Sequence, residues 1–332
     1  MISRVSILGA GAWGTALALA ARRAGRKVTL WARNPDLAET IAAKHRNPAY
    51  LPGIELDKTI AATHELNRAV AEAEALLLVC PAQHLRALCS RLAGLPESAA
   101  PLVICAKGIE QRSGLLPSAV VAETLPGREL AVLSGPSFAS EVARSLPTAI
   151  TLACADAKTG AALVKALGSK AFRPYLAGDL IGAQVGGAVK NVIAIACGIA
   201  MGLRLGDNAR AALITRGLAE ISRLNAALGG KPETMQGLSG LGDLMLTCSS
   251  MTSRNYSLGY ALGEDMSLSD ILGSRKSVSE GIYTASAVVQ LAARHGIEMP
   301  IAEAVDRVLR DQSAIEEAIE ALLARPFKAE GD

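Results

Sequence analysis

The first half of the chain alternates short apolar runs with longer stretches of helical periodicity. The apolar runs predict strands at Arg4–Leu8, Lys27–Ala32, Ala75–Cys80, Leu102–Ala106, Leu130–Leu133 and Ala149–Ala153. Between the strands, helices are expected at Thr15–Ala24, Pro35–Lys44 and Ala82–Leu92. This alternation predicts an α/β fold with a Rossmann-like, doubly wound parallel sheet that helices cover on both faces.

The second half changes to a helical period near Gly178–Gln184. One apolar stripe at helical spacing consists of Ile214, Leu218, Ile221, Leu224 and Leu228. Further helices are expected at Tyr283–His295 and Ala302–Ala324, and a Ser-, Thr- and Gly-rich segment, Leu238–Ser257, lies before them. This half is therefore expected to form a second, mostly helical domain.

The length and composition support two ordinary folded domains. A chain of 332 residues is too long for one typical core. We place a dinucleotide-binding domain at residues 1–180 and a helical substrate-binding and catalytic domain at residues 181–332. Aromatic residues make up only 3% of the chain, so helices are expected to pack closely through small side chains. The net charge is only +3, and the basic and acidic residues are interspersed along the chain, which argues against a nucleic-acid surface.

Several classes of site and location are also disfavoured. The six cysteines form no CxxC pair and the four histidines are dispersed, so we predict no disulfide framework and no metal site. The first residues enter a strand without the pattern of a signal peptide. The nearest approach to a membrane span is Asn191–Leu203, which is short and contains glycines. We therefore expect a cytoplasmic protein without a stable membrane anchor.

A glycine-rich loop, Gly9-Ala10-Gly11-Ala12-Trp13-Gly14, follows the first strand and precedes a helix. A lone motif of this kind is a weak signal, but in this context it fits a dinucleotide-binding loop. The helix that follows would offer free amides to the phosphates of the cofactor. The second strand ends in Arg33 instead of a carboxylate, which favours NADPH over NADH if Arg33 pairs with a 2′-phosphate. A solvated surface charge is the alternative for Arg33.

Lys190 lies within a stretch that otherwise reads as buried helix, with Val189, Val192 and Ile193 beside it. Burial disfavours the ammonium form and lowers the pKa of a lysine, which makes it useful as an acid or base. The alternative is a lysine whose stem lies along apolar surface while its ammonium group reaches water. From this segment alone the alternative is the more common case.

Other candidate polar residues follow predicted strands or lie in glycine-rich segments. Lys107 follows a strand at the edge of the sheet where ligands bind, and Gly135 and Ser137 follow the next strand. Asp243 lies in what reads as a flexible, glycine-flanked loop. Taken singly, each of these residues is more often a turn, a cap or a surface charge.

A phosphate seat is expected where Ser253-Arg254-Asn255 opens a helix, because a serine cap, an arginine and free amides suit a phosphate. Reduction of a ketone by a nicotinamide creates an alkoxide that must receive a proton. A lysine ammonium such as Lys190 can supply this proton, and Lys107 nearby would lower its pKa. Asp243 would then orient either the lysine or a substrate hydroxyl.

Taken together, these motifs resemble those of the NAD(P)-dependent glycerol-3-phosphate dehydrogenases of the bacterial soluble type. The resemblance covers nearly the whole chain, and besides the glycine loop it rests on the segments Asn47–Pro52, Ala106–Gly108, Ser134–Ala139, Gly186–Asn191, Asn208–Arg210, Thr215–Gly217, Gly240–Leu244 and Ser253–Asn255. It implies reversible reduction of dihydroxyacetone phosphate to sn-glycerol 3-phosphate with NADH or NADPH. This reaction supplies glycerophospholipid synthesis.

The resemblance also implies roles for individual residues. Lys190 is similar to the catalytic proton donor and acceptor. The implied substrate contacts are Lys107, Gly135, Ser137, Lys190, Asp243, Ser253, Arg254 and Asn255. The implied cofactor contacts, with the glycine loop itself, are Gly9, Gly11, Ala12, Trp13, Gly14, Arg33, Tyr50, Lys107, Ala139, Arg254, Val278 and Glu280. Ala12 stands where the family commonly has serine, so a hydroxyl contact to the cofactor is lost while the amide remains.

Two other functions fit the same architecture. A β-hydroxyacid or sugar-phosphate dehydrogenase would share the central lysine, although Ser253-Arg254-Asn255 favours the glycerol phosphate type. A redox sensor would bind NADPH without turnover and would leave a buried Lys190 unexplained. A homodimer is one open alternative for the oligomeric state.

Overall fold

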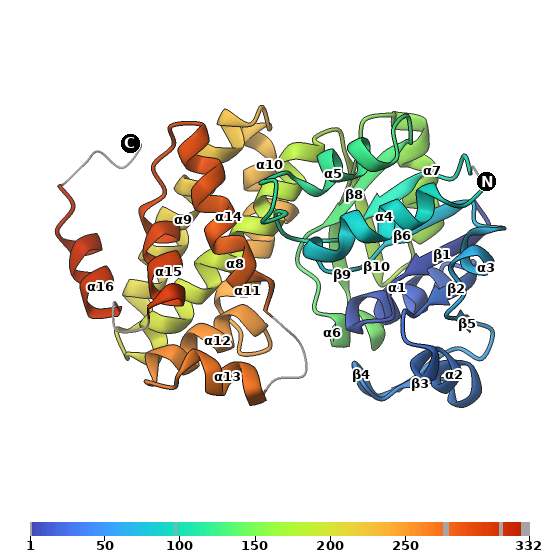
Figure 1. Cartoon of the computed structure of the whole chain (residues 1–332), viewed down its shortest axis with the longest axis horizontal. Helices are drawn as coiled ribbons and strands as arrows, with labels where there is room; N and C mark the ends of the chain where they lie inside the picture. Colours follow the sequence, from blue (N-terminus) through green and yellow to red (C-terminus); the bar gives the residue numbers. More distant parts are fainter. Residues whose placement is uncertain (1, 97, 275–278, 312–314, 327–332) are drawn as a thin grey trace.

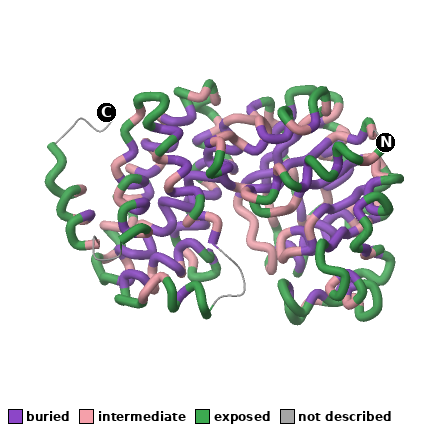
Figure 2. The backbone as a smooth tube through the Cα atoms, viewed as in Figure 1, coloured by how far each residue is buried: buried purple, intermediate pink, exposed green. Residues whose placement is uncertain are grey.

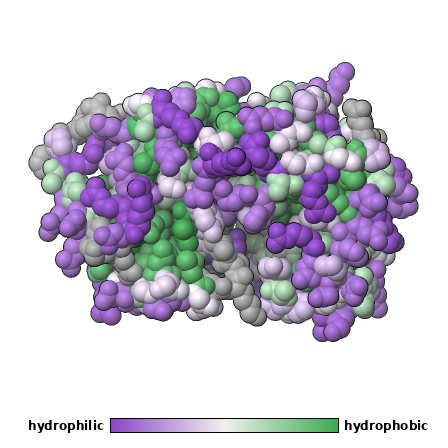
Figure 3. Space-filling view, viewed as in Figure 1, coloured by the Kyte–Doolittle hydropathy of each residue, from purple (hydrophilic) through white to green (hydrophobic). Residues whose placement is uncertain are grey.

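The structure is a computed structural model that describes residues 2–96, 98–274, 279–311 and 315–326. The first half of the chain builds a sheet with helices around it, and the second half builds a group of helices beside it (Figure 1). Figure 2 shows buried backbone running through the middle of both halves. The face seen in Figure 3 is mainly hydrophilic, with a hydrophobic area over the helical half.

Within the described residues, one eight-stranded sheet has the order β10-β9-β8-β7-β6-β1-β2-β5. Its strands are β1 (Arg4–Leu8), β2 (Lys27–Trp31), β5 (Ala61–Thr63), β6 (Ala75–Leu78), β7 (Leu102–Ile104), β8 (Leu130–Ser134), β9 (Thr148–Cys154) and β10 (Phe172–Ala177). The strands from β5 to β8 all run parallel. The order reverses between β1 and β6, which creates the crevice where ligands bind in doubly wound sheets. The predicted fold class is confirmed.

The last two strands are an exception to the parallel sheet. β9 pairs antiparallel with β8, and β10 runs parallel to β9. The connection from β8 to β9 contains only the five-residue helix α6 (Ala139–Ala143). The helix in a parallel crossover must carry the chain back along the strands, but five helical residues rise only about 8 Å, about half the length of a five-residue strand. The chain instead returns directly, so β9 points the opposite way.

The sequence pattern missed four short or polar strands. β5 has only three residues, and β3 (Arg46–Asn47) pairs with β4 (Leu51–Glu55) in a separate small hairpin. β10 lies at the sheet edge and contains Arg173 and Pro174. An edge strand tolerates proline and charge, so its sequence lacks the continuous apolar run that marks a central strand.

Helices pack on the sheet, and those expected at Thr15–Ala24, Pro35–Lys44 and Ala82–Leu92 are among them. They are α1 (Ala12–Arg23), α2 (Pro35–Lys44), α3 (Leu66–Val70), the 3₁₀ turn η1 (Ala82–His84) continuing into α4 (Leu85–Ala93), α5 (Pro117–Thr124), α6 and α7 (Ala157–Leu167). The expected helix at Pro35–Lys44 matches α2 at both ends. Asn34 caps α2 by accepting a hydrogen bond from Leu37 N, and Pro35 occupies its first turn.

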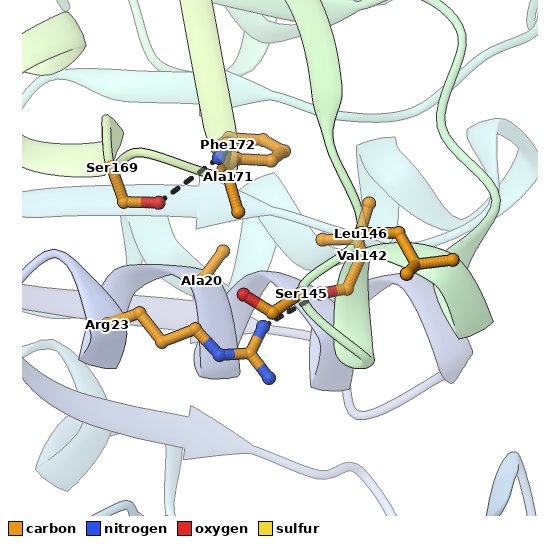
Figure 4. A pocket seen from close by; sticks show the side chains of 8 residues that line it. All are labelled: Ala20, Arg23, Val142, Ser145, Leu146, Ser169, Ala171 and Phe172. Carbon is orange, nitrogen blue, oxygen red and sulfur yellow. Dashed lines mark hydrogen bonds between the residues drawn. The ribbon is translucent and has the colours of Figure 1, made fainter.

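Arg23, the last residue of α1, connects α1 to α6. Its guanidinium donates to the carbonyl oxygen of Val142 at 2.8 Å and also to that of Ala143. These carbonyls lie at the end of α6, where helix carbonyls have no partner in the helix itself. Figure 4 shows Arg23 reaching toward Val142 and Ser145, beside the Ser169 and Phe172 turn. The contact fixes the carboxyl end of α1 against the end of α6.

The second half is helical from α8 onward, as expected. Its elements are α8 (Leu180–Gly202), α9 (Asp207–Ala227), α10 (Pro232–Gln236), the π-helical turn η2 (Leu238–Gly242), α11 (Asp243–Cys248), α12 (Arg254–Gly263), α13 (Leu268–Ser274), α14 (Glu280–Arg294), α15 (Pro300–Arg310) and α16 (Ile315–Leu323). The single helix expected at Ala302–Ala324 is wrong, because the described residues there form two helices, α15 and α16. The domain division after residue 180 stays a prediction.

α8 is the central helix of this half and packs against α9, α11, α12, α14 and α15. By length and composition it is the one helix of the described residues that could cross a membrane, and 89% of its apolar window is buried inside the protein. The uncharged apolar stretch noted from Asn191 belongs to this helix, which is longer because it continues through the charged Lys190. A helix that is apolar all round belongs in a core, and the helices packed against α8 bury most of its residues.

Candidate active site

The glycine loop between β1 and α1 has the geometry of a phosphate-binding turn. Gly9 has a positive φ of 135°, and a Cβ there would overlap the carbonyl oxygen of Val79 at the end of β6. A Cβ at Gly14 would overlap the carbonyl oxygen of Gly9, so α1 can approach the strand only through a glycine. A Cβ at Gly11 would meet no atom within 4 Å. Gly11 therefore keeps the outer side of the loop clear for a ligand.

Donors at the loop suit an anionic ligand. Gly11 is the N-cap of α1 and makes no side-chain cap, so the first amides of the helix, including those of Ala12 and Trp13, face outward from its end. The buried Asn47 supports the loop, because its amide donates to the carbonyl oxygen of Ala10 and to Thr15 Oγ1, each at 2.8 Å. These residues fit the pyrophosphate of a dinucleotide.

Two residues expected to contact the cofactor, Arg33 and Tyr50, lie on the surface. Arg33 is exposed and follows the end of β2, where no carboxylate stands beside it in the sequence. Tyr50 is 44% exposed, and its N–H donates to Asn47 Oδ1 at 3.2 Å. Trp31, at the end of β2, accepts from Gly9 N, and Asn47 connects Tyr50 to the glycine loop, so the contact of both residues with a cofactor stays a prediction.

The central feature of the site is Asp243, which joins two lysines from distant parts of the chain. Its Oδ1 accepts from Lys190 Nζ at 2.6 Å, and its Oδ2 accepts from Lys107 Nζ at 2.9 Å. Lys107 comes from the loop after β7, Lys190 from the middle of α8 and Asp243 from the start of α11. Asp243 is 1% exposed and Lys190 is 6% exposed. Burying charged groups costs stability unless they are paired. Here both lysines donate to the one carboxylate of Asp243.

Asp243 is not in a flexible loop, so that expectation is wrong. It is the first residue of α11 and follows the π-helical turn η2, which packs against α8. The glycines before it serve close packing. A Cβ at Gly240 would overlap the backbone of Met235, and one at Gly186 of α8 would overlap the carbonyl oxygen of Ser239. The glycines thus bring the two backbones together instead of making the segment flexible.

Thr247 is a further partner of Lys190 that the sequence analysis missed. Its Oγ1 donates to the carbonyl oxygen of Asp243 at 2.6 Å and accepts from Lys190 Nζ at 2.8 Å. Asp243 and Thr247 are four residues apart on α11, so they share one helix face. The four-residue spacing would identify Thr247 from the sequence if Asp243 were assigned to a helix. An assignment of Asp243 to a loop gives no such signal.

The pKa of Lys190 is lowered to about 8, because burial and the positive charge of Lys107 together outweigh the opposing effect of Asp243. The lysine is therefore in the interior and does not extend to water as the alternative required. A pKa near 8 allows both the ammonium and the amine to be populated close to neutral pH.

The turn after β8 holds Lys107 from the other side. Lys107 Nζ donates to the carbonyl oxygen of Gly135 at 2.9 Å, and Ser137 Oγ donates to the same oxygen at 2.9 Å. Gly135 has a positive φ of 142°, which turns its carbonyl toward the lysine. Ala139 begins α6 two residues after Ser137. These residues thus line the edge of the sheet beside the two lysines.

The segment expected to seat a phosphate does open a helix. Ser253 is the N-cap of α12, and its Oγ accepts from Tyr256 N at 3.2 Å. Arg254 is exposed at the first position of the helix. Asn255 is buried, and its Nδ2 donates to Asn191 Oδ1 at 2.9 Å. Asn191 follows Lys190, so the start of α12 is connected directly to the helix that carries the central lysine.

Glu280 enters the site from the start of α14. Its Oε1 accepts from the backbone N–H of Ala82 at 3.2 Å. Burial raises the pKa of Glu280, while the Ala82 N–H and the positive charges of Arg254, Lys107 and Lys190 oppose that rise. The carboxylate of Glu280 therefore interacts electrostatically with all three positive charges. Val278, the other expected cofactor contact of this segment, lies outside the described residues.

Comparison with known proteins gives one consistent result across the chain. Residues 4–160 match the family profile of the NAD-dependent glycerol-3-phosphate dehydrogenase N-terminus, and residues 179–320 match that of its C-terminus. A Rhodospirillum rubrum protein named glycerol-3-phosphate dehydrogenase [NAD(P)+] is 58% identical over 331 residues, covering 100% of this chain and 95% of the relative. One of the same name from Parvibaculum lavamentivorans is 56% identical, with 98% of each chain covered.

A solved structure shows the same similarity in three dimensions. The crystal structure of glycerol-3-phosphate dehydrogenase from Coxiella burnetii superposes with a TM-score of 0.94 at 40% sequence identity, covering 98% of this chain and 99% of that one. Both halves of the fold are therefore shared, including the helical half that carries Lys190 and Asp243.

Proposed function

The chain belongs to the NAD-dependent glycerol-3-phosphate dehydrogenase family, and on that premise we propose how its own residues perform the reaction. The protein is an oxidoreductase that uses NADH or NADPH to interconvert dihydroxyacetone phosphate and sn-glycerol 3-phosphate, which supplies glycerophospholipid synthesis. The observation that carries the proposal is the sharing of Asp243 by Lys190 and Lys107.

Lys190 is the proton donor to the substrate carbonyl oxygen and the proton acceptor in the reverse direction. An ammonium group has three N–H donors, and two of those of Lys190 donate to Asp243 and Thr247. We assign the third to the carbonyl oxygen of dihydroxyacetone phosphate. Asp243 and Thr247 hold the ammonium group in one orientation, so proton transfer begins from a fixed geometry.

Lys107 stabilises the negative charge that develops on the same oxygen. Its ammonium group is anchored by Asp243 and by the Gly135 carbonyl, which leaves a third N–H for the substrate. In a buried site such a fixed charge acts more strongly than it would in water. Gly135 and Ser137 are then placed to contact the hydroxyl end of the substrate.

The phosphate of the substrate binds at the start of α12. Arg254 supplies the charge, the first amides of the helix supply donors, and the capping hydroxyl of Ser253 can still donate because its oxygen only accepts from Tyr256 N. Asn255 retains a second Nδ2 N–H beside the one given to Asn191.

The nicotinamide cofactor supplies the hydride when it is bound. The glycine loop from Gly9 to Gly14 holds its pyrophosphate, and Ala12 contributes only a backbone amide there. Arg33 pairs with a 2′-phosphate, which favours NADPH. Tyr50, Ala139, Val278 and Glu280 are the remaining proposed contacts. A cytoplasmic location and a homodimer belong to the same proposal.

The Lys190→Ala variant tests the central assignment. General acid catalysis contributes about 10²- to 10⁴-fold. We therefore expect kcat for reduction of dihydroxyacetone phosphate to fall by about that factor, while the affinity for NADPH alone stays within about twofold. An exposed lysine variant, Lys58→Ala, is the matched control and should keep full activity. Near-normal turnover by Lys190→Ala would rule out its role as proton donor.

A further inference from the structure

Ser279 connects the start of α14 to the proposed phosphate seat. Its hydroxyl donates to the carbonyl oxygen of Arg254 at 3.1 Å, and the residue is only 1% exposed. Arg254 and Ser279 lie 25 residues apart in the sequence, so this bond joins two separate helices. This buried hydrogen bond fixes the position of the first turn of α12 relative to the start of α14.

Gly281 makes a second connection of the same kind. Its N–H donates to Asn255 Oδ1 at 3.0 Å. A Cβ at this position would lie 2.7 Å from Asn255 Oδ1, 2.8 Å from Ile195 Cδ1 and 2.9 Å from the carbonyl oxygen of Asn191. No larger residue fits without moving the helix. The glycine thus allows α14 to contact both the phosphate seat and the helix that carries Lys190.

The residue between them contacts the other half of the molecule. Glu280 accepts from the N–H of Ala82, which lies after β6 on the side of the cofactor crevice. Three consecutive residues therefore connect the substrate seat and the cofactor side through one helical turn. The two outer residues contact the start of α12, and the middle residue contacts the sheet half.

We propose that Ser279 and Gly281 are positioning residues that hold Arg254 and Asn255 in place for the substrate phosphate, and that this turn couples phosphate binding to cofactor binding. The inference rests on the proposed function, because it takes the start of α12 as the phosphate seat and Glu280 as a cofactor contact. A ligand that fixes the turn on one side lowers the entropy cost of ordering it on the other. Such coupling is reciprocal between the two ligands.

The Ser279→Ala variant tests the positioning role against a closely matched control. Ser257 also donates its hydroxyl to the Arg254 carbonyl, at 3.3 Å, but it lies on α12 itself and so makes no connection to α14. We expect Ser279→Ala to raise KM for dihydroxyacetone phosphate by about three- to tenfold with little change in kcat. Ser257→Ala should leave both constants unchanged, and Ser279→Thr, which keeps the hydroxyl, should restore KM.

The coupling is measured by titrating sn-glycerol 3-phosphate into the protein with and without NADPH, conditions under which no turnover occurs. The wild-type protein should bind sn-glycerol 3-phosphate more tightly with NADPH present, and this ratio should fall toward one in Ser279→Ala. Gly281→Ala should reduce it further, because its Cβ pushes α14 away from both asparagines. Circular dichroism would show that each variant is folded.

Two outcomes overturn the inference. One is a Ser279→Ala variant that behaves as Ser257→Ala does, and the other is a wild-type protein whose affinity for sn-glycerol 3-phosphate is the same with and without NADPH. Failure of the proposed function is distinguishable, since it would appear as a wild-type protein that does not reduce dihydroxyacetone phosphate with either nicotinamide.

Discussion

The pKa of Lys190 depends on a balance between burial, which lowers it, and the carboxylate of Asp243, which raises it. Full burial alone can lower the pKa of a lysine by several units and leave it neutral at physiological pH. Asp243 at 2.6 Å limits this effect, and because Lys107 shares that carboxylate, the compensation is incomplete. The resulting pKa of about 8 suits a group that must both give and take a proton.

The pH dependence of the two reaction directions should therefore be opposite. Reduction needs the ammonium form of Lys190, so its kcat should be constant below a pH of about 8 and fall as the pH rises beyond it. Oxidation of sn-glycerol 3-phosphate needs the neutral amine, so its kcat should rise through the same range. Initial rates measured across that range in both directions check the signs.

Lys107→Met provides the control for this assignment. Removing a neighbouring positive charge should raise the pKa of Lys190 and move both transitions to higher pH, even if the rates themselves fall. Transitions that stay in place would show that another group titrates. A flat profile in both directions would contradict the proton-transfer role itself.

At the scale of elements, the site depends on how closely α8 and α12 approach each other. Gly198 and Gly202 of α8 face Gly259 and Gly263 of α12, with three residues between the two glycines of each helix. A Cβ at any of the four would overlap a backbone carbonyl oxygen of the other helix. Close contact of this kind brings Asn255 within hydrogen-bonding distance of Asn191, next to Lys190.

Replacing one of these glycines should separate the helices. We expect Gly198→Ala to destabilise the protein by about 1–3 kcal/mol, because the added methyl group must displace the backbone of Tyr256. The comparison is Gly273→Ala on α13, where a Cβ meets nothing within 4 Å. That variant should be neutral or stabilise by up to about 0.5 kcal/mol. Urea denaturation measures both, and equal effects would contradict the close contact.

At the scale of the whole molecule, the site forms only where the two halves meet. Lys107 belongs to the sheet half, whereas Lys190 and Asp243 belong to the helical half. The chain passes between the halves at Asp179, which is buried. Its carboxylate accepts from Gly182 N at 2.9 Å, Lys231 N at 2.8 Å and Thr234 Oγ1 at 2.6 Å. Asp179 thus caps α8 and also holds the connection between α9 and α10 against its start.

Asp179→Ala should cost much more stability than the loss of an ordinary helix cap. It removes the cap of α8 and leaves two further, partly buried donors without this partner, so we expect about 3 kcal/mol. The matched control is Asp156→Ala, which removes the exposed cap that α7 receives at Thr159 N and should cost about 1 kcal/mol. Equal losses on urea denaturation would mean that Asp179 serves only as a cap.

Much of this arrangement is predictable from local patterns. The strand and helix periods, the glycine loop and the serine cap at Ser253 each depend on residues close in sequence, so they can be recognised from the chain alone. The direction of β9 and the position of β10 could not be predicted, because they depend on which strand each pairs with. The π-helical turn before Asp243 could not be predicted either, because it is ordered by packing against α8, which is distant in the sequence.

The sequence by itself determined the fold class, the family and the identity of the polar residues that suit ketone reduction. Only the tertiary structure decided that Lys107, Lys190 and Asp243 share one set of hydrogen bonds, that Thr247 joins them and that the Ser279 hydroxyl donates to the carbonyl oxygen of Arg254. The physical reason is separation along the chain. Lys107 and Asp243 lie 136 residues apart, and no local preference encodes the distance between their side chains. That distance depends on two close contacts of α8, that of Gly186 with η2 and that of Gly187 with Ser134 and Lys107.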